Sequence, residues 1–231
     1  MTTKHEMKKI FSIYGIAYLI LLTIVLILIF SYPKKELHML VNSCHTYAQD
    51  SFFKYYTLLA EWPLYILALI PLFWKKYRII IFYAISEIFS GTIAIILKSN
   101  INIERPIRMF EHDTDMVLPL VEGVNMHHSN SFPSGHSATF FVFFTCFALL
   151  LAYYYQQRAT HYDLKKKILM YLSMFLLFVL ASLGAYSRVY LSQHFLSDVC
   201  VGSIIGFVTP CLIFYFGKNL ILKPKTEDLK Q

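Results

Sequence analysis

Residues 187–198, Ser-Arg-Val-Tyr-Leu-Ser-Gln-His-Phe-Leu-Ser-Asp, join two long apolar segments and carry several polar side chains capable of chemistry. His194 and Asp198 are four residues apart, so on a helix they would share one face. Asp198 would then accept a hydrogen bond from one ring nitrogen of His194 and leave the other nitrogen free to attack an electrophile. Arg188 adds a planar cation suited to phosphate oxygens. The alternative without catalytic function is a polar connection between two membrane helices with a structural His–Asp pair.

The chain around this stretch is strongly apolar. Of its 231 residues, 57% are hydrophobic and 15% are charged, which is typical of a polytopic membrane protein. The length favours a single domain over residues 1–231. The four cysteines lack the spacing of metal ligands and are expected to be core residues without disulfides. The first apolar run is too long for a cleaved signal and is expected to remain as an anchor.

Hydrophobicity predicts an all-α protein built as a bundle of six transmembrane helices. Each apolar run approaches the ~20 residues that a bilayer core requires. The expected spans are residues 10–31, 54–74, 78–97, 134–155, 168–186 and 195–217.

Basic residues indicate how this bundle is oriented. Fourteen of the 21 lysines and arginines lie in residues 1–9, 75–78, 156–167 and 218–231, so the positive-inside rule puts both termini, including the tail 218–231, in the cytoplasm. Residues 187–194 then face outside. The distribution fits membrane topology better than nucleic-acid binding. The outside loops lack Asn-x-Ser/Thr sequons, which favours a bacterial plasma membrane with the site facing the periplasm or exterior.

Two more stretches lie at the same predicted face. Lys98 ends the third apolar run, and Pro106 should end the helix near Arg105, which would put both cations on one helical face. Snorkelling of basic side chains at a helix end is the alternative.

The segment Pro133-Ser134-Gly135-His136 begins the fourth apolar run. Ser131 or a neighbour can cap this helix. The unpaired amides of Ser134, Gly135 and His136 would then point toward an anion, and Gly135 lets the backbone approach closely. Read alone, the segment also fits a capped helix with an incidental histidine.

Together, KSNINIERP (98–106), PSGH (133–136) and SRVYLSQHFLSD (187–198) resemble the signature K-x6-RP, PSGH and SR-x5-H-x3-D of the type 2 phosphatidic acid phosphatase superfamily. The signature region is 98–198. The resemblance implies that His194 attacks phosphorus to form a phosphohistidine, that Asp198 fixes its tautomer, and that His136 protonates the leaving alkoxide. It implies no metal or other cofactor. The residues expected to hold the phosphoryl oxygens are Lys98, Arg105, Ser134, Gly135 and Arg188.

The expected function is therefore hydrolysis of a phosphate monoester or diphosphate of a lipid. Relatives act on isoprenoid diphosphates, lipid A, phosphatidylglycerophosphate and phosphatidic acid, and the sequence does not choose among them. The expected partners are this substrate and the bilayer, without nucleic acid, and the oligomeric state is not determined. A lipid phosphotransferase is one alternative. An anion transporter is another, although its charges would be expected near the midplane.

Three further features of the chain raise secondary hypotheses. His127, His128, Asp113 and Asp115 lie in the loop after the third span, but adjacent histidines point in different directions, which disfavours a metal site. Glu87 lies inside an apolar run, where an ionisable group is costly, and is expected to bond a neighbouring helix. The connection 33–53 is expected to hold a short helix at the interface.

Overall fold

The computed structural model describes residues 3–62, 65–67, 70, 77–111, 113, 115–158 and 164–221. Within these ranges the chain forms helices and loops without strands, which confirms the all-α class. The elements are α1 (Thr3–Ser31), α2 (Lys34–Val41), α3 (Tyr47–Tyr56), the 3₁₀ turn η1 (Thr57–Ala60), α5 (Tyr77–Asn100), α6 (Pro106–Met109), α7 (Gly135–Arg158), α8 (Leu164–Tyr190) and α9 (Leu196–Ile221).

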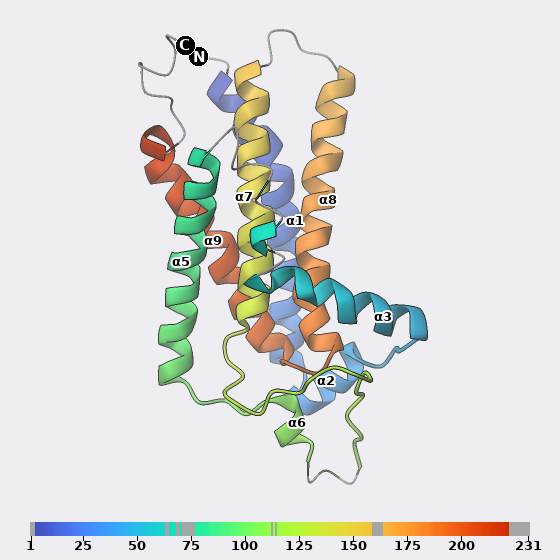
Figure 1. Cartoon of the computed structure of the whole chain (residues 1–231). Coiled ribbons are helices and arrows are strands. Elements are labelled where there is room, and N and C mark those ends of the chain that lie inside the picture. Colours follow the sequence, from blue (N-terminus) through green and yellow to red (C-terminus); the bar gives the residue numbers. More distant parts are fainter. Residues whose placement is uncertain are drawn as a thin grey trace.

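Five long helices form the described part of the bundle, and α7 contacts each of α1, α5, α8 and α9 (Figure 1). All five are long and apolar enough to cross a bilayer. Large apolar side chains on the helices remain exposed, including Phe30, Ile95 and Phe216. Contact with lipid accounts for this apolar surface, which water would disfavour. The protein is therefore an integral membrane protein.

The predicted span over residues 54–74 is wrong at its beginning. Thr46 caps a helix that starts earlier, because its side chain accepts a hydrogen bond from the Gln49 amide at 3.3 Å. This helix, α3, runs across the bundle rather than along it (Figure 1). It passes into η1, and extended backbone at Glu61 then interrupts the helical path. Residues 63–64, 68–69 and 71–76 lie outside the described residues, so a sixth span stays a prediction.

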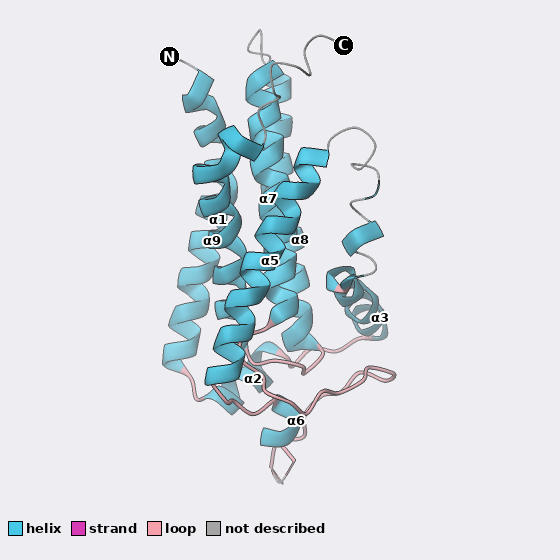
Figure 2. Ribbon diagram, turned by 60° about the vertical axis from the view of Figure 1, so that its left-hand side comes forward, coloured by secondary structure: helices cyan, strands magenta, loops and turns pink. Residues whose placement is uncertain are grey.

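The described loops and short helices gather at one end of the bundle (Figure 2). The described start of α1 and end of α9 lie at the opposite end. In the connection 33–53 the expected short helix is α2, which buries Leu37 and His38. The predicted tail 218–231 is helical as far as Ile221, and the rest lies outside the described residues.

Close contact between α7 and α9 depends on two glycines. A Cβ atom on Gly202 would lie 2.4 Å from the Ser134 carbonyl oxygen, and one on Gly206 would lie 2.2 Å from that of Ala138. Asp198, Gly202 and Gly206 follow at four-residue intervals, so one face of α9 meets the start of α7. This contact brings the 131–136 segment to the first turn of α9.

Candidate active site

The end of α8 presents the 187–194 stretch. This helix continues to Tyr190, so Ser187 and Arg188 are helical and buried rather than part of a polar loop. Ser192 adopts a positive φ of 52°, and the amides of Gln193 and His194 both donate to the Arg188 carbonyl, at 3.0 and 3.1 Å. These bonds satisfy the end of α8 and turn the chain sharply. His194 is thereby directed back into the protein.

The predicted pairing of His194 with Asp198 on one helical face is wrong in its geometry. Helix α9 begins at Leu196, so His194 precedes it and Asp198 lies in its first turn. The Asp198 carboxylate accepts a hydrogen bond from the Phe195 amide at 3.0 Å, which satisfies a free N–H of the helix start. Its Oδ2 atom lies 3.8 Å from Nδ1 of His194, which is too long for a hydrogen bond.

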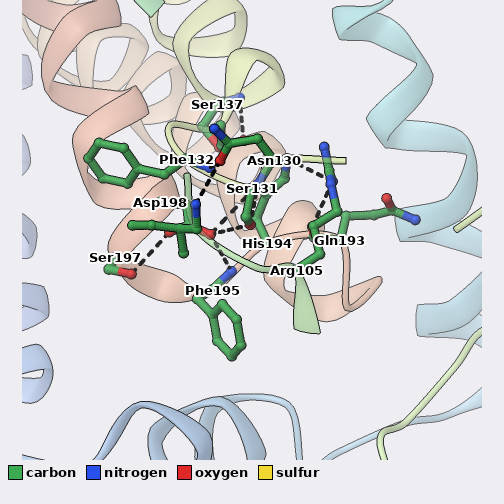
Figure 3. Close-up of polar contacts among 12 residues, drawn as sticks. Arg105, Asn130, Ser131, Phe132, Ser137, Gln193, His194, Phe195, Ser197 and Asp198 are labelled. Atoms are coloured by element: carbon green, nitrogen blue, oxygen red, sulfur yellow. Dashed lines mark hydrogen bonds and ion pairs between the residues drawn. The ribbon is translucent and has the colours of Figure 1, made fainter. Parts of the chain in front are cut away.

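Ser131 links the two side chains and was missed as a site residue by sequence reasoning. Its hydroxyl lies 2.5 Å from Asp198 Oδ2 and 3.3 Å from His194 Nδ1. Figure 3 shows Ser131 beside Asp198 and His194. All three side chains are at most 3% exposed. The sequence signal was a serine two residues before the PSGH segment, which was considered only as a helix cap. In the structure the cap is Ser134, whose hydroxyl accepts from the Ser137 amide at 3.4 Å.

Arg105 lies on the other side of the imidazole. Helix α5 ends at Asn100, not near Arg105, because the Asn130 side-chain amide bonds the Lys98 carbonyl at 2.6 Å and also the Ile101 carbonyl, holding the chain in an extended path. Lys98 and Arg105 therefore do not share a helical face. One Arg105 nitrogen donates to the Gln193 carbonyl at 2.8 Å and lies 3.4 Å from His194 Nε2.

The contact with Arg105 fixes the roles of the two imidazole nitrogens. A guanidinium only donates, so Nε2 must be the acceptor and carry the lone pair. Nδ1 then holds the proton that faces Ser131 and Asp198. Burial lowers the pKa of His194 to about 3, an effect that nearby arginines reinforce and Asp198 opposes. The ring is therefore neutral near pH 7, with the lone pair of Nε2 directed at a cation.

Three cations surround this position. Arg188 is 5% exposed, donates to the Thr57 hydroxyl at 2.8 Å, and leaves its Nε atom without a protein partner. Lys98 lies within electrostatic range of Arg105, Arg188 and Asp198. Burial also lowers the pKa of Arg105. Concentrated, partly desolvated positive charge of this kind is a favourable environment for a phosphate anion.

The start of α7 supplies further donors. The sequence predicted a free Ser134 amide, and this prediction is wrong. The amide donates to the Asp198 carbonyl at 3.0 Å. Gly135 and His136 are the first residues of α7, where amides have no partner within the helix. The Nε2 atom of His136 is buried without a hydrogen-bond partner. The helix start thus offers two amides and one imidazole to a ligand.

Two cavities adjoin His136. One, of ≈ 220 Å³, lies between α5 and α7 and includes Lys98 and Gly135 in its lining. The other, of ≈ 340 Å³, is lined by polar groups of α3, η1 and the 123–127 loop and reaches Arg188 and Gln193. His136 therefore separates a cavity among membrane helices from a polar one.

One of the residues raised as a metal site, Asp113, takes another partner. Asp113 pairs with Lys35 at 2.7 Å, and this bond is the main cause that lowers the Asp113 pKa. Among the described residues, which leave out residues 112 and 114, no three histidine, cysteine or acidic side chains converge as metal ligands. Burial and neighbouring cations lower the pKa of His127. The four cysteines are free thiols.

The helical membrane bundle gathers two histidines, an aspartate and three cations at one end. The family model described as the PAP2 superfamily matches residues 79–221, and the chain belongs to that superfamily. A Drosophila melanogaster protein named "Putative phosphatidate phosphatase" is 40% identical over 98 residues, which are 42% of this chain and 24% of that protein. The chain thus matches about a quarter of that relative's length.

Two solved structures share the fold. LpxE of Aquifex aeolicus aligns with a TM-score of 0.55 and 24% identity, covering 80% of this chain and 98% of that one. A PAP2-type phosphatidylglycerolphosphate phosphatase of Bacillus subtilis aligns with a TM-score of 0.55 and 18% identity, covering 95% and 100%. At these identities the likeness concerns the fold.

Proposed function

We propose that this protein removes phosphate from a lipid phosphate monoester or diphosphate through a phosphohistidine on His194. The observation that carries the proposal is the orientation of that imidazole. Its protonated Nδ1 faces Ser131 and Asp198, and its Nε2 lone pair faces Arg105. A neutral, oriented nitrogen beside a group of cations is suited to attack phosphorus.

In the first step Nε2 of His194 forms a bond to phosphorus while the bond from phosphorus to the lipid oxygen breaks. His136, in its imidazolium form, gives its Nε2 proton to the leaving oxygen and becomes neutral. The negative charge that develops on the phosphoryl oxygens is stabilised by Lys98, Arg105, Arg188 and the free Gly135 amide. Ser134 acts by capping α7 and holding it to α9 rather than through its amide.

In the second step His136 takes a proton from water, and the water oxygen attacks phosphorus. The nitrogen–phosphorus bond breaks, phosphate leaves, and the electron pair returns to Nε2 of His194. The same residue acts as acid and then as base. No metal takes part in this scheme, so activity should persist in excess chelator.

The assay is phosphate release from lipid phosphates in mixed micelles by the purified full chain. The His194→Ala variant should lose this activity, and denatured wild-type protein labelled with a radioactive lipid phosphate should retain acid-labile label that the variant lacks. Equal phosphate release by wild type and His194→Ala would overturn the proposal.

We also propose six spans in one domain, with both termini in the cytoplasm and the site facing outside. Support comes from the described ends of α1 and α9, which lie opposite the site, and from the cations in the described helix turns at that end: Lys8, Lys9, Arg78, Arg158, Lys165, Lys166, Lys167 and Lys218. The test uses single cysteines at residues 99 and 219 in a chain whose own cysteines are replaced. An impermeant maleimide added to intact cells should label residue 99, and residue 219 should react only after the cells are opened. Labelling of both from one side would contradict this topology.

A lipid phosphotransferase is the second candidate. The polar cavity beside His136, at ≈ 340 Å³, is far larger than one water needs and could hold an acceptor alcohol. Product analysis with added alcohols distinguishes the two reactions, because transfer would exceed phosphate release.

A further inference from the structure

The cavity between α5 and α7 contains polar atoms that the proposed reaction does not use. Glu87, Ser90, Gly91, Ala94 and Lys98 all contribute to its α5 wall. Their spacing puts them along one face of the helix. The small residues in the middle make room, and the long polar side chains stand at the two ends.

At the deep end of the cavity, hydrogen bonding is incomplete. Glu87 Oε1 accepts from the Thr139 hydroxyl at 2.6 Å, so the predicted bond to a neighbouring helix is present. Its other oxygen, Oε2, is buried without a hydrogen bond of good geometry, and its neighbour is the Tyr65 hydroxyl, which is also unpartnered. The Ser90 hydroxyl is also unpartnered, and Ser90 is 1% exposed. Unsatisfied polar atoms in a buried site cost stability, and two of them beside one cavity point to a ligand with matching groups.

The position of these atoms defines which part of a ligand they would meet. Thr139 follows His136 by three residues, so the Glu87–Thr139 pair lies about 4.5 Å deeper along α7 than the proposed acid. A phosphate held beside His136 would place the next few atoms of its lipid at that depth. In an acylglycerol phosphate these atoms include the ester groups, whereas in an isoprenoid phosphate they are hydrocarbon.

The chemistry of the two side chains matches acyl linkages. The Ser90 hydroxyl can donate to a carbonyl oxygen. A carboxyl group can donate to a carbonyl when it carries its proton, and can accept from an amide when it does not. A saturated or prenyl chain would leave both groups unsatisfied and buried, which disfavours its binding.

We propose that this cavity binds the polar backbone of the lipid, and that Glu87 and Ser90 select phosphates of ester- or amide-linked acyl lipids over isoprenoid phosphates. The inference rests on the proposed phosphatase function and narrows its substrate. Glu87 and Ser90 are specificity residues here and take no part in bond breaking.

The test uses three substrates with one phosphate each: dioleoyl phosphatidic acid, its dialkyl ether analogue without carbonyl groups, and farnesyl monophosphate. The enzyme is the full chain in mixed micelles. Wild type should favour the diacyl lipid over the ether analogue about fivefold or more in kcat/KM, because one hydrogen bond to a matched group gives a factor of this order. Farnesyl monophosphate should be a poorer substrate still.

The variants are Ser90→Ala and Glu87→Leu. Each should lower kcat/KM for the diacyl lipid about fivefold or more while changing the value for the ether analogue less than about twofold. The matched control is Thr92→Ala, since Thr92 is exposed on the lipid-facing side of α5 and bonds its own helix at Ile88. This control should leave the preference unchanged.

The outcomes separate the two proposals. If wild type releases no phosphate from any of the lipids, the proposed function fails. If it hydrolyses all three equally well, only the selectivity proposal fails. If both variants lose kcat/KM equally on the diacyl and the ether lipid, Glu87 and Ser90 have a structural role. This result would also overturn the selectivity proposal.

Discussion

Removing the Ser131 hydroxyl tests the link that holds the proposed nucleophile. In Ser131→Ala, Asp198 Oδ2 loses the 2.5 Å hydrogen bond, and His194 Nδ1 loses its nearest polar neighbour. A hydrogen bond to a charged group is worth about 1.5–3 kcal/mol. The Phe195 amide still donates to Oδ2, so the carboxylate is not left bare and the lower value applies. We expect kcat/KM to fall about tenfold.

A double-mutant cycle shows whether Ser131 acts through the carboxylate. Asp198→Asn alone should cause the larger loss, and adding Ser131→Ala to it should cost little more, because the two side chains act as a unit. Ser86→Ala is the control, since Ser86 is equally buried but bonds its own helix at Phe82. Activity of Ser131→Ala within about twofold of wild type, or fully multiplicative effects in the cycle, would refute the reasoning.

Three other predictions concern packing, charge and pH. Gly202→Ala should lower both the unfolding temperature and the activity, because the added Cβ would lie 2.4 Å from the Ser134 carbonyl oxygen. Gly15→Ala is the control and should change neither, because its Cβ would have nothing within 4 Å. Equal unfolding temperatures of the two variants would contradict this prediction. Arg188→Lys keeps the charge but loses the fork that reaches Thr57, so kcat/KM should fall about tenfold or more, and a preserved value would remove this residue from phosphate binding. Burial lowers the pKa of His38 from 6.5 to about 4, so the unfolded chain takes up a proton below pH 6.5 that the folded protein binds only near pH 4. Stability should therefore fall on acidification by about 1.4 kcal/mol per pH unit within that window, and denaturant unfolding at pH 7 and 5 should show a smaller loss for His38→Phe.

The sequence predicted which residues come together better than it predicted their local geometry. Lys98, Arg105, His136, Arg188, His194 and Asp198 do meet at one end of the bundle, because apolar runs fix where the helices cross and the polar stretches fall at their ends. Periodicity does not show which backbone bonds end a helix. The Asn130 side chain ends α5 early, and the turn at Ser192 keeps His194 outside α9. The Asn130 bond joins residues 32 apart in sequence, and the turn depends on the positive φ of Ser192, so hydrophobic periodicity indicates neither.

Ser131 escaped prediction for a related reason. Its neighbours in sequence suggest a helix cap, and its contact with Asp198 exists only because Gly202 and Gly206 let α9 approach α7 closely. The span expected from residue 54 was wrong because hydropathy averages over a window, whereas Thr46 and Glu61 set the actual limits of α3 and η1. Local caps override average hydrophobicity at segment ends.

The position of His136 between two cavities suits the two halves of the proposed reaction. The cavity between α5 and α7 has Lys98 at one end and Glu87 at the other, so a lipid lying in it would bring its leaving oxygen to His136 from the membrane side. After the lipid leaves, the second reactant would come from the polar cavity that reaches Arg188. Because each reactant has its own approach, water need not cross the lipid site. An imidazole at the junction can therefore give its proton on one side and take the next from the other.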